Sequence, residues 1–273
     1  MPDPLIITVA PNGARKLKTD HAALPISPDE LAQTAADCLE AGAAMIHLHV
    51  RDEEGRHSLD VEAYRAAIRA VRNRVGKDLI IQATTESVGI YNADQQMVMV
   101  RELAPEAVSL AIREICPGPA MEEKAAAFFT HLRDAGIFPQ YILYSKEDIR
   151  YFRDLLTSGV IPDPGPHVLF VLGRYSPGMT SDPSDLLPFL AAADGMDCDW
   201  SVCAFGALEG ACALTAAGLG GHCRVGFENN LLLADGTIAP DNAALVAQVG
   251  GQAGFMGRSV ASAAEARKLL GMG

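Results

Sequence analysis

Hydrophobic and polar positions follow two different periods along this chain. In the stretch 45–52, Met-Ile-His-Leu-His-Val-Arg-Asp, apolar residues alternate with His47 and His49, which is the period of a β-strand. Over residues 61–75, which follow Asp60, the apolar residues instead recur at helical spacing. The strand pattern and the helix pattern alternate along the chain, so the sequence predicts strands and helices in alternation.

Eight strand–helix units can be counted in this way. Strands are expected at 5–10, 45–52, 79–84, 107–112, 138–143, 167–172, 199–205 and 222–227, and helices at 28–39, 61–75, 92–103, 120–135, 146–158, 183–193, 208–217 and 241–249. Eight such units predict an α/β fold of the (β/α)8 TIM-barrel type. We expect a single domain over residues 1–273 that ends in a helical segment at 261–270. An open doubly wound sheet is the alternative, but no G-x-G-x-x-G follows the first strand.

Composition narrows the class of protein further. The 273 residues are 49% hydrophobic and 21% charged, and 34 acidic against 22 basic residues give a net charge of −12. This charge argues against a protein that coats nucleic acid or binds anionic lipid. No apolar run reaches the roughly 20 residues of a membrane span, and no signal peptide is visible. The six cysteines form no C-x-x-C pair, which favours reduced thiols and a cytoplasmic location.

The barrel prediction sorts the seven histidines by position, because functional residues stand at the carboxyl ends of barrel strands. His167 and His222 begin strands, and His21, His57 and His131 fall on loops or within a helix. Only His47 and His49 are therefore expected at the end where chemistry occurs.

A carboxylate is predicted to meet these two histidines. Glu228 lies at the carboxyl end of the eighth strand, on the same face as Arg224, and strands 2 and 8 both flank strand 1. Two imidazoles and one carboxylate with open positions form a catalytic site for zinc or another divalent transition metal. The simpler interpretation is a pair of hydrogen-bonded core histidines and a solvated glutamate.

Other polar residues follow the strands at the same predicted rim. Those expected to bind substrate are Asn12, Gly13, Thr84, Thr85, Arg113 and Gly173. Together with Glu86, Glu114 and Arg174, they are expected to form a polar opening to the barrel that can accept an anion.

Three longer motifs, in this order, resemble those of the β-keto acid cleavage enzymes. They are Ile-Ile-Thr-Val-Ala-Pro-Asn-Gly-Ala at 6–14, Ala-Gly-Ala at 41–43 followed by the histidine strand, and Gly-Gly-His-Cys-Arg-Val-Gly-Phe-Glu-Asn-Asn at 220–230. The resemblance implies a TIM barrel with a divalent metal, usually zinc, held by His47, His49 and Glu228. It also implies that a β-keto acid and acetyl-CoA give acetoacetate and a new acyl-CoA, with Arg224 assisting the anionic groups, and it suggests a homo-oligomer such as a dimer or tetramer.

The chain departs from the family at several of its active-site positions. Asn229 replaces an aspartate that is proposed as a base, and an amide cannot take a proton at neutral pH. Carboxylates appear instead at Glu86 and Glu114, so we expect one of these to act as the base on a substrate different from that of 3-keto-5-aminohexanoate cleavage enzyme. Two alternatives stay open. One is another metal-dependent barrel enzyme, an aldolase, lyase or hydrolase; the other is a metal- or acyl-CoA-binding homologue with impaired turnover.

Overall fold

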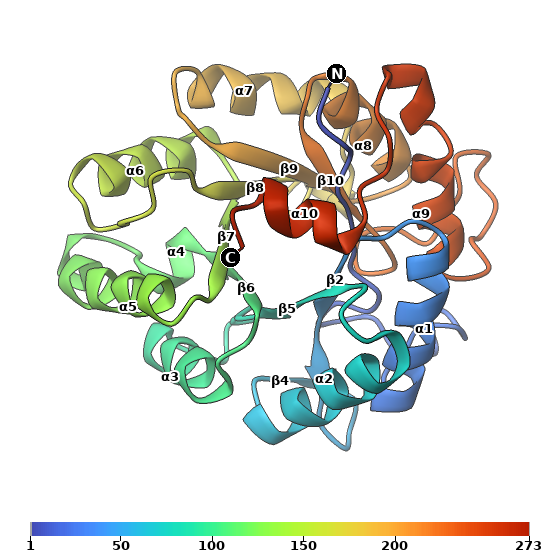
Figure 1. Cartoon of the computed structure of the whole chain (residues 1–273), viewed down its shortest axis with the longest axis horizontal. Helices are drawn as coiled ribbons and strands as arrows, with labels where there is room; N and C mark the ends of the chain where they lie inside the picture. Colours follow the sequence, from blue (N-terminus) through green and yellow to red (C-terminus); the bar gives the residue numbers. More distant parts are fainter. Residues whose placement is uncertain (1, 273) are drawn as a thin grey trace.

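The strands close into a parallel barrel in the computed structural model, which describes residues 2–272. Their order around the barrel is β1-β10-β9-β8-β7-β6-β5-β2, with helices outside (Figure 1). The strands are β1 Ile7–Val9, β2 Met45–Leu48, β5 Ile80–Thr84, β6 Ala107–Ala111, β7 Phe138–Leu143, β8 His167–Leu172, β9 Asp199–Ala204 and β10 His222–Val225. The predicted (β/α)8 fold is confirmed.

The helices are α1 Pro28–Glu40, α2 Val61–Val75, α3 Ala93–Leu103, α4 Ile112–Ile115, α5 Glu122–Asp134, α6 Lys146–Thr157, α7 Leu187–Ala193, α8 Glu209–Gly218, α9 Asn242–Gly250 and α10 Ala263–Leu269. Six of the helices in the described range begin at a side-chain cap: α1, α2, α3, α6, α9 and α10. Ser27 forms a capping box with Glu30 at α1, and Asp60 accepts from the Ala63 amide at α2. Four 3₁₀ turns join them: Pro119–Met121, Pro177–Met179, Pro183–Leu186 and Ala253–Met256.

The two ends of the barrel differ in what fills them. The predicted closing segment, α10, lies across the amino-terminal end (Figure 1), where Ala263 and Ala266 pack on a cluster of strand-start residues that includes Ile6 and Met45. Further along, the interior also contains polar side chains, and Gln82 and Gln140 are buried there. The barrel interior therefore has hydrogen-bonding groups ready beneath its carboxyl end.

The histidine strand differs from its prediction. β2 ends at Leu48, and residues 50–51 leave the barrel as β3 (Val50–Arg51), which pairs antiparallel with β4 (His57–Ser58). One continuous strand over 45–52 was therefore wrong in its second half. The hairpin folds residues 57–58 back beside the end of β2.

The last barrel strand also ends earlier than expected, at Val225. Gly226 has φ +137°, and a Cβ there would lie 2.4 Å from the Ala10 carbonyl oxygen. Only glycine permits this close approach of β10 to the end of β1. The turn that follows carries Glu228 over the barrel mouth.

Within residues 2–272, none of the helices combines the length and the apolar character needed to cross a membrane. Residues 1 and 273, the two ends of the expected single domain, lie outside the described range.

Candidate metal centre and active-site cavity

Three predicted metal ligands meet at one point above the barrel. His47 Nε2 lies 3.1 Å from His49 Nε2, and Glu228 Oε2 lies 3.6 Å from the first nitrogen and 3.4 Å from the second. Ligands about 2.1 Å from a tetrahedral zinc ion stand roughly 3.4 Å apart. The three donor atoms thus have the spacing of ligands around one such ion.

Strand β1 brings these side chains together, because it pairs with both strands that carry them. Val9 is in register with Ile46 on one side and with Val225 on the other. Gly13, just beyond β1, has φ +61°, and a Cβ there would lie 2.5 Å from the Glu228 Cγ. The glycine therefore leaves the space that the carboxylate side chain occupies.

The charge states of His47 and Glu228 also suit a cation. Burial, and then the Arg224 guanidinium, lowers the pKa of His47 to about 3, so its ring is neutral at pH 7. Burial opposes ionisation of Glu228, but Arg224 and then His49 hold the pKa of Glu228 well below its usual range. Its Oε2 is buried and has no hydrogen-bond partner among the described residues. An unpartnered buried carboxylate oxygen facing two imidazole nitrogens fits a bound divalent metal.

Hydrogen bonds from neighbouring residues hold the three candidate metal ligands in place. His47 Nδ1 donates to Gln82 Oε1 at 2.8 Å, and Gln82 Nε2 in turn donates to Gln140 Oε1 at 3.3 Å. Arg224 Nη2 donates to the second oxygen of Glu228 at 3.1 Å. Asn12 Nδ2 donates to the His49 carbonyl at 3.0 Å. Such outer contacts orient metal ligands.

A narrow recess lies beside the three candidate ligands, with about 400 Å³ of empty space that includes open solvent at its entrance. Its walls are formed by His47, His49, Thr84, Thr85, Glu86, Ala111, Glu114, Ile142, Tyr144, Val171, Arg174, Phe205, Arg224 and Glu228. The lining combines apolar side chains with ionised groups. The recess therefore offers both kinds of contact next to the candidate ligands.

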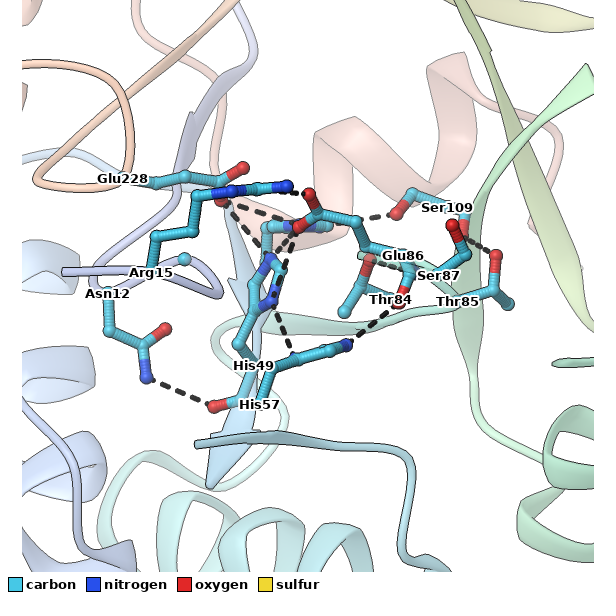
Figure 2. A network of polar contacts seen from close by, with 12 residues as sticks. Asn12, Arg15, His49, His57, Thr84, Thr85, Glu86, Ser87, Ser109 and Glu228 are labelled. Carbon is cyan, nitrogen blue, oxygen red and sulfur yellow. Dashed lines mark hydrogen bonds and ion pairs between the residues drawn. The ribbon is translucent and has the colours of Figure 1, made fainter. Parts of the chain in front are cut away.

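The two carboxylates at 86 and 114 differ in their partners. Glu86 Oε1 lies 2.8 Å from Arg15 Nη1 and 3.9 Å from Arg174 Nη2, and Figure 2 shows it facing Arg15 above His49. Glu114 accepts from the Ser87 amide at 3.0 Å and the Ser87 hydroxyl at 2.9 Å. Burial raises the pKa of Glu114.

A second recess, lined by basic and acidic side chains, adjoins the first. Its walls include two of the predicted substrate-binding residues, Asn12 and Gly13, together with Arg15, Lys16 and Arg174. Lys16 Nζ donates to the Glu228 carbonyl at 2.8 Å, so it also supports the turn that holds this ligand.

Three predicted site residues line neither the cavity nor the adjoining recess. Arg113 pairs with Asp148 at 2.6 Å and stacks on Tyr144 and Tyr175. Gly173, with φ +76°, packs against the Thr180 backbone, which a Cβ would approach to 2.7 Å. The side chain of Asn229 is 4% exposed, and neither of its amide atoms has a hydrogen-bond partner within the described part of the chain.

Sequence reasoning missed several residues that the fold places at or beneath the site. His57 was assigned to a loop and set aside, but its ring lies 5.2 Å from the His49 ring, centroid to centroid. Burial, then His49, lowers the pKa of His57 to about 4. Glu209 is fully buried under the Glu228 turn, where it accepts from the Gly226 amide at 3.0 Å. The short segment 52–56, which ends in Gly55-Arg56, is the signal from which the hairpin could have been found.

Comparison with known proteins agrees with this architecture. The family model described as beta-keto acid cleavage enzyme matches residues 4–272. The chain is 33% identical to a 3-keto-5-aminohexanoate cleavage enzyme of Fusobacterium nucleatum, covering 100% of this chain and 99% of the relative. It is 30% identical to a 3-oxoadipate:acetyl-CoA acetyltransferase of Cupriavidus necator, covering 100% and 96%.

Among solved structures, a binary complex of ObcA with oxaloacetate superposes with a TM-score of 0.71 at 18% identity, over 91% of this chain and 67% of that one. This likeness supports the fold. The full-length match to the family model and the 33% identity establish the family itself. The expectation of an enzyme of this class is thereby confirmed: the chain belongs to the beta-keto acid cleavage enzyme family.

Proposed function

We propose that this protein is a metal-dependent acyltransferase that cleaves a β-keto acid with acetyl-CoA. The observation that carries the proposal is the convergence of His47, His49 and Glu228 beside a recess at the carboxyl end of the barrel. Relatives named for acetyl-CoA-dependent keto acid chemistry support the reaction class. The keto acid's acyl group would pass to the sulfur of CoA, and its carboxymethyl carbon would join the acetyl group to form acetoacetate. Neither an oxidant nor water is consumed.

A divalent ion in this site would act as a Lewis acid on the keto acid's oxygens and stabilise the negative charge that develops on bond cleavage. The chain's own residues would orient the acid. Arg224 is 4% exposed and projects its guanidinium between Glu228 and the cavity. It would hold Glu228 ionised and attract the carboxylate of the substrate.

Removing a proton from the carbon between the keto and carboxylate groups requires a base. Asn229 cannot supply it, whereas Glu86 and Glu114 both line the cavity. We favour Glu114, because burial raises its pKa, whereas Glu86 is engaged by the Arg15 guanidinium at 2.8 Å. Glu114→Gln should lower kcat by about 10²- to 10⁴-fold. The matched change Glu86→Gln should act mainly on KM, and unchanged activity in both variants would reject a base at either position.

The direct test is to incubate the pure protein with acetyl-CoA and a panel of β-keto acids and to measure acetoacetate. The panel should include a diacid, an amino-substituted acid and an unbranched apolar acid. Metal analysis of wild type against His47→Ala, with His167→Ala as a buried histidine at the other end of the barrel, tests the metal site.

Absence of acetoacetate from every acid, with zinc still bound, would reject the cleavage reaction. Acyl-CoA binding without turnover would then favour the binding-protein alternative that Asn229 raises. The homo-oligomer and the single domain over residues 1–273 stay predictions, which light scattering and limited proteolysis test.

A further inference from the structure

The hairpin β3–β4 brings a third histidine against the metal-site pair. His57 is 5% exposed, and its Nδ1 lies 3.4 Å from His49 Nδ1 (Figure 2). On its other edge, His57 Nε2 lies 2.8 Å from the backbone carbonyl oxygen of Glu86. The ring therefore bridges the back of one metal ligand and the strand end that carries Glu86.

The chemistry of these contacts fixes where the hydrogens are. A carbonyl oxygen can only accept, so His57 Nε2 must carry the hydrogen and donate it. In the neutral ring, His57 Nδ1 is then an acceptor, and His49 Nδ1 must donate to it. His49 is left with its Nε2 free of hydrogen and with a lone pair directed at the metal site.

The other ligand follows the same rule through a different partner. His47 Nδ1 donates to Gln82 Oε1, whose orientation Gln140 sets, so His47 Nε2 is also free of hydrogen. In these tautomers both Nε2 nitrogens can offer a lone pair to one cation beside the Glu228 oxygen. Glu86 Oε2, at 3.9 Å from His49 Nδ1, is beyond hydrogen-bond distance, which leaves His57 as the nearer acceptor.

We propose that His57 is a positioning residue, which fixes the tautomer and the ring orientation of His49 so that its Nε2 faces the metal. The inference rests on the proposed metal site and names a residue outside its ligand set. Without an acceptor at Nδ1, His49 can adopt the tautomer that carries hydrogen on Nε2, and metal binding must first displace that hydrogen. Loss of an outer partner of this kind typically lowers metal affinity by about 10- to 100-fold.

Three variants separate this role from packing. His57→Leu removes the acceptor, and His57→Asn keeps an acceptor oxygen near the position of Nδ1. His167→Gln removes a buried histidine at the opposite end of the barrel. Zn²⁺ affinity is measured by competition with a chromophoric chelator, and thermal unfolding of each metal-free protein is recorded alongside. We expect His57→Leu to bind Zn²⁺ about 10- to 100-fold more weakly, His57→Asn to recover most of that loss, and His167→Gln to bind as wild type does.

Long-range ¹H–¹⁵N spectra of the histidine-labelled, metal-free wild type report the tautomers directly, and they decide the question even if His57→Leu fails to fold. Hydrogen on His49 Nδ1 supports the proposal; hydrogen on Nε2 overturns it. Wild-type affinity in His57→Leu, or equal losses in His57→Leu and His57→Asn, would also overturn it. If the wild-type protein binds no Zn²⁺, the proposed metal site itself is rejected. If wild type and His57→Leu bind Zn²⁺ equally, the metal site stands and only the role of His57 is rejected.

Discussion

Replacing Gly13 by alanine should move Glu228 and weaken the metal centre. Alanine at φ +61° incurs a backbone cost of about 1–2 kcal/mol. Its Cβ would also lie 2.5 Å from the Glu228 Cγ and 3.3 Å from the Glu228 Cα, where ordinary contacts begin near 3.4 Å. Relieving a shortfall of about 0.9 Å requires the carboxylate or its turn to shift, and overpacking of this kind costs about 1–3 kcal/mol more.

Gly136 provides a matched control, since it has φ +66° and a Cβ added there would meet no atom within 4 Å. Gly136→Ala should therefore show the backbone cost alone. We expect Gly13→Ala to be the less stable variant in urea unfolding, to bind Zn²⁺ at least about 10-fold more weakly and to lose about 10² in kcat/KM, as a misplacement near 1 Å does. Equal Zn²⁺ affinity in the two alanine variants would refute the claim that Gly13 makes room for the ligand.

Three further perturbations test other parts of the site. Burial raises the pKa of Glu209 to about 8, so between its usual value of 4.5 and 8 the folded protein holds a proton that the unfolded chain releases, and stability falls as pH rises. Urea unfolding at several pH values should show a fall of a few kcal/mol in wild type that Glu209→Gln lacks; parallel profiles would contradict this. Arg224→Met leaves buried Glu228 without its cationic partner and should destabilise the metal-free protein by about 3–5 kcal/mol, partly recovered when Zn²⁺ is added; a variant as stable as wild type would argue against the pair. Chelation of the wild type should lower its Tm, and Zn²⁺ at about 100 times its Kd should restore about 2.7 kcal/mol, a response that His47→Ala should lack.

The sequence was sufficient to predict the barrel and the convergence of His47, His49 and Glu228, because both depend on local periods and on chain topology. His47 and His49 share a face in any strand, and Glu228 reaches them in any closed barrel whose first strand lies between the second and the eighth. His57 could not be placed in this way, since its position depends on a two-residue pairing that reverses the chain after β2. Arg113 was predicted to bind substrate because it follows a barrel strand. A residue at such a position can also turn away from the cavity, and Arg113 turns toward Asp148.

The pairing of β1 with both β2 and β10 has a consequence for how the barrel opens. β1 spans only three residues and is the shortest strand of the barrel. We therefore expect the barrel to open most readily at this strand. A cation bound by both His47 and Glu228 would link β2 to the turn after β10, on either side of β1. Metal binding should therefore slow amide exchange in β1 and β10 more than in β6 or β7, because the ion would link the first barrel strand's two neighbours.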